Sequence, residues 1–540
     1  MKTLYTQFYK LFAVALFVGC SFSGMAQGWS WATQGGGADK DAGNNVCMDA
    51  TGNTIVVGYF SGSATFGKTI LVSTGSTDIF IAKYSSSGAF LWAVKAGGTD
   101  GDEATAVATD GSDNIYVTGS FSGTSADFGK LTVNGTGGTD FFVAKFDSYG
   151  AAIWVTTTNG ADNERGNDIQ SDALGQLSII GEFSGTASFG GLFKYQAVGG
   201  TDIFVAACDP SGTLTWVSAA GGKGDDWGMG IAVDGGNNCY VTGSFTSAAD
   251  FGSINVTGSA FDNLFLAQYD TKGNASWVSV ASGNSYVVPL DIQCNAKGGT
   301  YITGYYDGTI ALGGQKFAAV AGNDIFIVRY DYTGNVIWAN TAGGKGADNG
   351  KSIAIDGSGN CYIAGSFESQ ADFGSYTAKG TGKEIYVAKY DTYGNPVGVV
   401  SAGGAGDDNA TGIAADASGN VSVTGSFEQI AAFGSTNLTS TGNNDIFIAQ
   451  VSIVTQVAAT EIFSNEMDVY PNPSLGHATI LCPAGQLSLE VYNALGEKVI
   501  SYEGAVANGR YNFTPGKPGV YYVKMQQGDK VARMQLVVLE

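Results

Sequence analysis

The stretch that decides the fold is Thr77-Asp78-Ile79-Phe80-Ile81-Ala82-Lys83-Tyr84, because close copies of it return six more times along the chain. The central aromatic residue recurs at steps of 60 to 62 residues, at Phe80, Phe142, Phe204, Phe265, Phe326, Tyr386 and Phe447. A tryptophan, a strand glycine and a turn aspartate repeat with it. A fixed period of this length is typical of architectures in which each repeat is one supersecondary unit.

Each period contains four runs of residues that are typical of β-strands. In the second copy these runs are 91–96, 105–109, 114–121 and 140–146, all rich in β-branched and aromatic residues and bounded by turn residues. No segment shows a helical period. Four short strands per unit and seven units predict an all-β fold, a seven-bladed β-propeller with four strands per blade.

The phase of the repeat predicts how the ring closes. The first tryptophan strand, at 29–35, has no partner strand before it, and the last strand of the array, at 445–451, has none after it. Pairing these two strands would complete the last blade and remove two exposed sheet edges. We therefore expect the N-terminal strand to close the last blade.

Two residue columns have local structural explanations. Turns such as Asp356-Gly357-Ser358-Gly359-Asn360 suit a tight hairpin, in which the aspartate bonds its own backbone and a glycine takes positive φ. A glycine inside a strand indicates that another backbone group approaches closely. Seven such glycines recur on equivalent strands: Gly58, Gly119, Gly181, Gly243, Gly304, Gly365 and Gly425.

The composition excludes several classes of function. The 540 residues include 82 glycines and a single histidine, His477, and the net charge is -22. A chain this acidic cannot release counterions from nucleic acid, so nucleic-acid binding is not expected. One histidine excludes multi-histidine zinc sites and leaves no partner for a serine or cysteine nucleophile in the repeats. The sequence also contains no nucleophile motif for which a histidine could act as the base.

The N-terminus has the three-part pattern of a secretory signal. Lys2 and Lys10 precede a short apolar run, which ends in small residues at Ala26, so residues 1–26 are predicted to be removed. Lipidation at Cys20 is an alternative, although the residues before it fit that signal poorly. No stretch reaches the length of a transmembrane helix. We expect an exported protein with no transmembrane segment.

The repeats resemble the SBBP-type β-propeller repeat of secreted bacterial proteins. The residues that carry the resemblance are the runs 221–226, 231–234, 240–245 and 250–252 in the fourth unit. The resemblance covers the predicted propeller, residues 27–452, and implies its fold. It implies no activity, because the family as a whole has no assigned chemistry.

The C-terminal residues form a separate module. After a linker at 453–467, residues 468–540 contain alternating strands that predict a small immunoglobulin-like β-sandwich. The motif Tyr470-Pro471-Asn472-Pro473, a second motif around Gly496, and the runs 519–523 and 536–538 resemble the type A C-terminal sorting domain of the type IX secretion system of Bacteroidota. This resemblance implies the type IX machinery as a partner, passage across the outer membrane, and cleavage of the domain. It also implies attachment to surface lipopolysaccharide in many cases.

The candidate functional site is a column of acids, ten residues after each tryptophan slot. It consists of Asp41, Asp102, Glu164, Asp226, Asp348 and Asp408, with Val287 in the fifth unit. Neighbouring acids such as Asp39 and Asp225 extend it, and all of these carboxylates are expected to lie on one rim of the propeller. Three interpretations stay open: calcium binding by loop carboxylates, hydrogen bonding of each acid within its own loop, and attraction of cationic ligands.

Two functions follow from these observations. The first is a non-catalytic, monomeric scaffold at the cell surface or outside the cell, which binds glycan or protein or mediates adhesion and requires no cofactor. The second is a carbohydrate-active hydrolase or lyase that uses propeller carboxylates together with calcium, since glycoside hydrolysis requires only two acids at suitable spacing. Every acid singled out belongs to a repeating column, which favours the scaffold.

Overall fold

The computed structural model describes residues 28–453, 468–470, 478–481, 485–493, 498–506, 510–514, 517–527 and 530–538. The predicted signal peptide, the linker from residue 454 onward, and the motif residues Pro471, Asn472, Pro473 and Gly496 lie outside these residues. The chain divides into two compact units, Met1–Val454 and Thr455–Glu540. Throughout the described residues the fold is all-β with antiparallel sheets.

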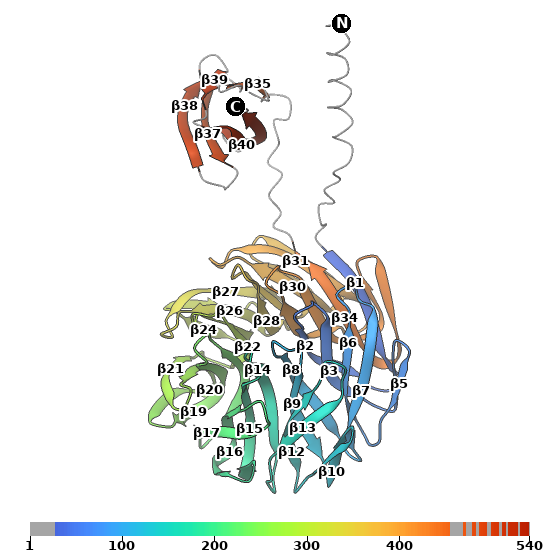
Figure 1. The fold of residues 1–540 in the computed structure, drawn as a ribbon. Coiled ribbons are helices and arrows are strands. Elements are labelled where there is room, and N and C mark those ends of the chain that lie inside the picture. The colour runs from blue at the N-terminus through green and yellow to red at the C-terminus, as the bar shows by residue number, and fades with distance from the viewer. Residues whose placement is uncertain are drawn as a thin grey trace. The chain divides into compact units, whose positions relative to one another are not determined.

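Seven four-stranded antiparallel units follow one another in the first part of the chain (Figure 1). The first two are β2 (Ala42–Met48), β3 (Thr54–Phe60), β6 (Asp78–Tyr84) and β7 (Phe90–Gly98), then β8 (Asp102–Thr109), β9 (Ile115–Ser122), β12 (Thr139–Phe146) and β13 (Ala152–Thr157). The third and fourth are β14 (Glu164–Ser171), β15 (Leu177–Phe189), β16 (Phe193–Cys208) and β17 (Leu214–Gly222), then β18 (Trp227–Val233), β19 (Cys239–Phe251), β20 (Ile254–Tyr269) and β21 (Ala275–Ala281). The fifth and sixth are β22 (Val287–Cys294), β23 (Thr300–Tyr306), β26 (Asp324–Tyr330) and β27 (Val336–Gly344), then β28 (Asn349–Ile355), β29 (Cys361–Phe373), β30 (Tyr376–Tyr390) and β31 (Pro396–Gly404).

The seventh unit joins the two ends of the array. It consists of β32 (Asn409–Ala415), β33 (Val421–Phe433), β34 (Thr436–Ser452) and the N-terminal strand β1 (Gly28–Gly37). Strand β1 pairs with β34 in antiparallel register, from Gly28 opposite Ser452 to Gly35 opposite Ile446. The predicted pairing of residues 29–35 with 445–451 is therefore confirmed.

The first strands of the seven units lie next to one another in a closed ring. Each of β2, β8, β14, β18, β22, β28 and β32 contacts the next, and β32 contacts β2. In Figure 1 the units succeed one another around these strands, so that the blue β1 meets the orange β34. The ring positions one end of every first strand around a common axis.

A second hairpin, which the strand pattern did not predict, links consecutive units. In three units it is made of separate short strands: β4 (Ser63–Phe66) with β5 (Thr69–Val72), β10 (Ser125–Phe128) with β11 (Leu131–Asn134), and β24 (Thr309–Leu312) with β25 (Gln315–Ala318). In the other units it extends the second and third strands. In five cases the hairpin pairs with the tryptophan strand of the preceding unit, as β10 does with β7. The tryptophan strands are thus bonded on both edges at these junctions.

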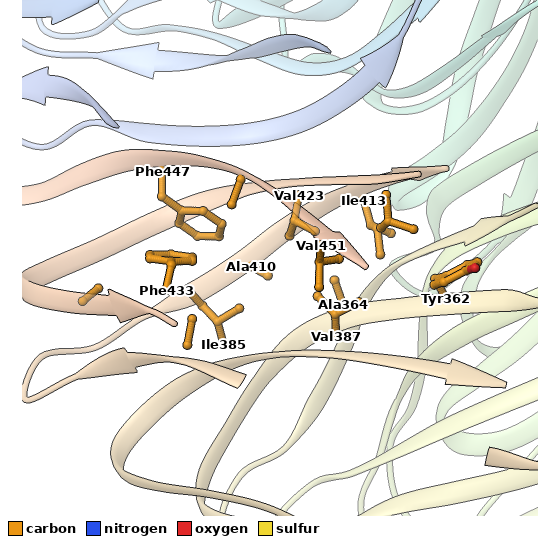
Figure 2. Close-up of a cluster of buried hydrophobic side chains, with 14 of the residues drawn as sticks. Tyr362, Ala364, Ile385, Val387, Ala410, Ile413, Val423, Phe433, Phe447 and Val451 are labelled. Carbon is orange, nitrogen blue, oxygen red and sulfur yellow. The ribbon is translucent and has the colours of Figure 1, made fainter. Parts of the chain in front are cut away.

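The hydrophobic core lies between neighbouring units. In the cluster of Figure 2, Tyr362, Ile385 and Val387 of the sixth unit pack with residues of the seventh. Phe433 and Phe447 have ring centroids 5.0 Å apart within this cluster. Burial of aromatic and branched side chains between units stabilises the ring, because each unit has an apolar face that it cannot cover alone.

The strand glycines are explained by a bulge in each first strand. The register between the first and second strands shifts by one residue beside every glycine of the column. This shift places a first-strand carbonyl against the glycine, so a Cβ at Gly365 would overlap the carbonyl oxygen of Asn349. The predicted close approach is confirmed at all seven positions.

The turn aspartates also behave as predicted. Asp356 accepts hydrogen bonds from the backbone N–H groups of Ser358 at 2.9 Å and Asn360 at 3.0 Å, and Gly359 has φ of 80°. Equivalent bonds recur at the other turns of this column.

The C-terminal unit consists of two antiparallel sheets that share one core. One sheet contains β35 (Asp468–Tyr470), β36 (Ala478–Leu481) and β39 (Arg510–Phe513), and the other β37 (Gly485–Asn493), β38 (Lys498–Val506), β40 (Gly519–Gln527) and β41 (Lys530–Val538). Ile480 and Phe513 of the first sheet pack with Leu489 and Met525 of the second. Of the sorting motif, only Tyr470 lies in a described strand, at the end of β35.

Candidate functional site

The six predicted site acids are buried. Asp41, Asp226, Asp348 and Asp408 are 0% exposed, and Asp102 and Glu164 are 1% exposed. Their neighbours Asp39, Asp100, Asp162, Asp225 and Asp407 are exposed. The column therefore lies beneath the surface, and only the neighbouring acids face solvent.

Each aspartate of the column is bonded to backbone N–H groups. Asp226 Oδ2 accepts from Gly222 at 2.6 Å, and its Oδ1 accepts from Thr246 at 3.2 Å. The same two bonds recur at Asp41, Asp102, Asp348 and Asp408. Glu164 differs, because its Oε2 accepts from the Thr158 hydroxyl at 3.1 Å. The hydrogen-bonding interpretation is confirmed for the aspartates, whereas ligand and calcium binding stay predictions.

A second column of acids, which the sequence analysis did not single out as a site, faces the first. It is an acid in the third strand of each unit: Asp78, Asp140, Asp202, Asp324, Glu384 and Asp445, with Asn263 in the fourth unit. Asp202 and Asp226 show the geometry: a Cβ placed on Gly221 would lie 2.8 Å from Asp202 Oδ1 and 3.0 Å from Asp226 Oδ2. The same arrangement recurs around Gly36, Gly97 and Gly343.

The paired carboxylates lie at the junctions between units. In each pair, one acid belongs to the third strand of one unit and the other precedes or begins the first strand of the next, as Asp324 in β26 and Asp348 before β28 do. We call these six the carboxylate pairs: Asp78–Asp102, Asp140–Glu164, Asp202–Asp226, Asp324–Asp348, Glu384–Asp408 and Asp445–Asp41. The seventh junction has Asn263 and Val287 instead.

The first-column acid of each pair favours its protonated form. Burial, the largest cause, and the neighbouring Asp78 together raise the pKa of Asp102 to about 7, against two backbone N–H bonds that lower it. Burial likewise raises the pKa of Asp226 to about 6 and that of Asp408 to about 7. A low-polarity environment destabilises the charged form of a carboxyl group, and a second negative charge adds to this effect.

A cavity of about 650 Å³ lies at the axis of the ring. Its lining comes from the first strands β2, β8, β14, β22, β28 and β32 and from the aspartate turns that follow three of them. The turn acids Asp49, Asp110 and Asp416 lie in this lining. A concave, polar site of this size is within the range of small-ligand pockets.

The cavity has two positions that break the sevenfold pattern. The residue after the bulge in each first strand is Asn45, Ala106, Asp168, Gly230, Asp291, Ser352 or Gly412. Two positions further, on the same face of the strand, the residues are Cys47, Ala108, Gln170, Ala232, Gln293, Ala354 and Ala414. The third and fifth units alone therefore carry Asp-Ile-Gln, and all four of their polar side chains line the cavity.

Asp168 and Asp291 are held in place by backbone and side-chain donors. Asp168 accepts from the N–H groups of Ile169 and Ile231, both at 2.8 Å. Asp291 accepts from Ile353 N–H at 2.8 Å and from the Ser352 hydroxyl at 2.7 Å. Burial raises the pKa of Asp168 well above its usual range, and the nearby Asp291 raises it further. Burial also raises the pKa of Asp291, to about 6.

The sequence does mark Asp168, Gln170, Asp291 and Gln293, but the repeating columns of acids make this pattern hard to recognise. Asp168-Ile169-Gln170 and Asp291-Ile292-Gln293 are identical tripeptides in equivalent positions, where the other units carry small residues or asparagine. Val287 distinguishes the fifth unit in the acid column, but that column does not show that the fifth unit matches the third at these three positions. The residues became recognisable when the ring placed the two strands around one cavity.

Across the described ranges, no group of three or more His, Cys, Asp or Glu side chains is arranged to hold a metal ion. Any cation site built from the carboxylate pairs would therefore have two side-chain ligands and draw its other ligands from the backbone or from water. The described cysteines Cys208, Cys239 and Cys361 are buried as free thiols within the core.

The comparisons identify the C-terminal module. Residues 468–539 match the family of secretion system C-terminal sorting domains. This domain directs export by the type IX secretion machinery, so the protein is exported to the cell surface or the extracellular space. In the part of the chain that the structure describes, no helix has the length and hydrophobicity to cross a membrane.

The other comparisons are less informative than the match of the sorting domain. The chain is 23% identical over 501 residues to the uncharacterized WD repeat-containing protein L264 of Acanthamoeba polyphaga mimivirus, with 74% of this chain and 36% of that protein covered. The chain thus spans about a third of the length of this relative. Solved structures with similarity include the extracellular domain of the putative one component system BT4673 from B. thetaiotaomicron (9% identity, 95% of this chain and 99% of that chain covered, TM-score 0.19). Another is PorZ, a surface component of the type-IX secretion system of Porphyromonas gingivalis (11% identity, 94% and 100% covered, TM-score 0.16). TM-scores this low do not support a conclusion about the fold.

Proposed function

We propose that residues 27–452 form a seven-bladed β-propeller of the SBBP repeat type that binds glycan or protein outside the cell without catalysing a reaction. The closed ring of seven four-stranded units and the pairing of β1 with β34 support the propeller. The sorting domain supports a place of action at or beyond the cell surface. The protein would then act as a monomeric binding or adhesion scaffold.

One observation carries the choice of binding site, the two Asp-Ile-Gln tripeptides that face the axial cavity. Gln170 and Gln293 present amide groups that can both donate and accept hydrogen bonds, and Asp168 and Asp291 add acceptors. Hydroxyl groups of a sugar are donors and acceptors in the same way. Because the residue equivalent to Gln170 and Gln293 is alanine in four of the other five units, these amide groups are not needed to build the ring.

The arrangement favours binding over hydrolysis. A glycosidase needs one carboxyl group free to give a proton and another free to act as base or nucleophile. In the axial cavity all four oxygens of Asp168 and Asp291 already accept hydrogen bonds. Their remaining lone pairs can still accept hydrogen bonds from a ligand, so these fixed carboxyl groups suit binding.

The test uses a variant whose new residues already occur at the equivalent positions of other units. Gln170→Ala combined with Gln293→Ala gives both units the alanine that Ala108, Ala232 and Ala354 already provide elsewhere. Glycan-array and calorimetric binding of the full chain should be lost in this variant, while its melting temperature stays within about 1 °C of the parent. Gln315→Ala, at an exposed position of β25, is the matched control and should bind normally.

Two outcomes would change the proposal. Unchanged binding by the double variant would remove the axial cavity as the site. Reducing ends released from a polysaccharide by the parent protein would favour the alternative, a carbohydrate-active hydrolase or lyase.

A further inference from the structure

The carboxylate pairs place negative charge inside the protein with little visible compensation. Among the ion pairs in the described part of the chain, only Asp78 of these acids contacts a base, Lys95, at 2.9 Å. A buried charge is strongly destabilising unless a counter-charge or hydrogen bonds offset it. Five of the six pairs therefore lack a side-chain cation, although all the acids are buried.

One oxygen in most pairs has no partner. Asp202 Oδ1, Asp324 Oδ1 and Asp445 Oδ1 are buried and accept no hydrogen bond, and the same is true of Asp140 Oδ1 and Glu164 Oε1. Asp202 is 3% exposed, Asp324 4% and Asp445 1%. In these three pairs the free oxygen points to the same glycine face as the first-column Oδ2, with both atoms 2.5–3.1 Å from the Cβ position of that glycine. Each of these pairs thus brings two carboxylate oxygens to one glycine, where the first-column Oδ2 accepts the following backbone N–H and the second-column Oδ1 accepts no hydrogen bond.

The seventh junction shows what the protein puts in that place when the acids are absent. Asn263 replaces the third-strand acid and Val287 replaces its partner, so both acids are lost together. The Asn263 Nδ2 donates to three carbonyl oxygens, those of Phe245 at 3.0 Å, Ser259 at 3.1 Å and Phe261 at 2.6 Å. An amide that carries partial positive charge therefore occupies a pocket of oxygen atoms.

We propose that each of the four carboxylate pairs with an unpartnered oxygen, Asp140–Glu164, Asp202–Asp226, Asp324–Asp348 and Asp445–Asp41, binds one calcium ion, which links neighbouring units of the ring. Calcium takes 6–8 oxygen ligands from carboxylates, backbone carbonyls and water, at sites of irregular geometry. Two carboxylates neutralise its charge, and the carbonyl positions marked by Asn263 provide further oxygen ligands. The inference concerns the unit junctions and does not depend on glycan binding in the axial cavity.

Protons compete with calcium for these pairs. The carboxyl groups must be ionised to bind a cation, so binding is expected to strengthen as pH rises and to release protons. Measurements at pH 8 therefore give calcium its full affinity.

The experiment counts calcium ions on the full chain. Protein stripped with a chelator and dialysed against micromolar calcium at pH 8 should bind four ions by equilibrium dialysis with elemental analysis. The variant Asp202→Asn with Asp226→Val transfers the natural Asn263–Val287 combination to the preceding junction and should bind three. Asp225→Asn, which neutralises the exposed neighbour of Asp226, is the control and should still bind four.

Thermal melting gives the second readout. Calcium should raise the melting temperature of the stripped parent at pH 8 by several degrees, and by much less at pH 5. Absence of bound calcium at pH 8, or a double variant that binds as many ions as the parent, would overturn the proposal. An equal loss in Asp225→Asn would also overturn it, because the ions would then be held by surface charge.

Discussion

A covalent link across the seam between β1 and β34 tests the closure of the ring. Ala32 and Ala449 lie opposite each other in this pair, 417 positions apart in sequence. Opposite residues of antiparallel strands have Cα atoms about 4.5 to 5.5 Å apart, which is within the range that a disulfide can span. The variant Ala32→Cys with Ala449→Cys is therefore expected to form a disulfide without displacing the backbone.

The size of the effect follows from the length of chain that the link closes. In the chain-entropy treatment, a bridge across about 400 residues restricts the unfolded state by about 6 kcal/mol, whereas engineered bridges commonly deliver about 2–4 kcal/mol. For a domain of this size, each kcal/mol shifts the melting temperature by about 1 °C, since the unfolding entropy is about 2 cal/mol/K per residue. The oxidised variant should melt about 2–6 °C above its reduced form.

The assay is a thermal melt with and without reductant, with the bridge mapped by mass spectrometry because the parent also has free cysteines. The control is Gln34→Cys with Ala449→Cys, a diagonal pair in the observed register, whose Cα atoms are about 7–8 Å apart and beyond easy bridging. Equal cross-linking of both variants, or none in the Ala32 variant, would refute the register. Cross-linking without a rise in melting temperature would refute the claim that the seam opens on unfolding.

Three further predictions concern stability. Gly365→Ala forces a Cβ against the carbonyl oxygen of Asn349 and should destabilise the protein by about 1–3 kcal/mol more than Gly252→Ala, where the space is open and only the φ of 63° is unfavourable; urea unfolding measures both. Lys83→Met removes the ammonium group that lies 2.8 Å from the buried Asp49 carboxylate. Burial raises the pKa of Asp49, but the Lys83 ammonium and the hydrogen bonds of the turn lower it to about 2. The substitution should cost about 3–5 kcal/mol, and adding Asp49→Asn should recover most of the loss; failure to recover would mean that the ion pair is not the cause. In buffer free of divalent cations, the melting temperature should fall as pH rises from about 4 to 8. Burial raises the folded-state pKa values of Asp41, Asp102, Glu164, Asp226, Asp348 and Asp408 to about 6 or 7, so the folded chain holds more protons than the unfolded chain; a rise over this range would contradict the burial argument.

Much of the fold could be predicted because each local sequence pattern recurs in every unit. The strand at 140–146, the bonded turn at Asp356 and the crowded Gly365 each recur seven times, so chance agreement is small. The strands of the hairpin at β10 and β11 were missed, because four-residue strands between turn residues give a weak alternation signal. Their partner is the preceding unit, which local patterns do not reveal.

The candidate site was predicted only in part. Asp226 and its equivalents were found as a column, but their burial and their pairing with Asp202 and its equivalents were not. The two acids of a pair are separated by a whole strand and a turn, and each has its own local explanation as a strand or loop residue. Asp168 and Asp291 were missed for a related reason, since a single Asp-Ile-Gln has no meaning until two of them face one cavity.

The sequence by itself determined the number of units, their strand content, the pairing of the two ends and the sorting domain, because these depend on periodicity and on contiguous motifs. Only the tertiary structure decided which charges are buried together and which side chains face the axis. Closing the ring brings the third strand of one unit against the first strand of the next, and the free energy of a carboxylate depends on those spatial neighbours and on its access to water. The acids of the two columns are not surface charges in the folded ring. They are buried in pairs, and several of their oxygen atoms accept no hydrogen bond.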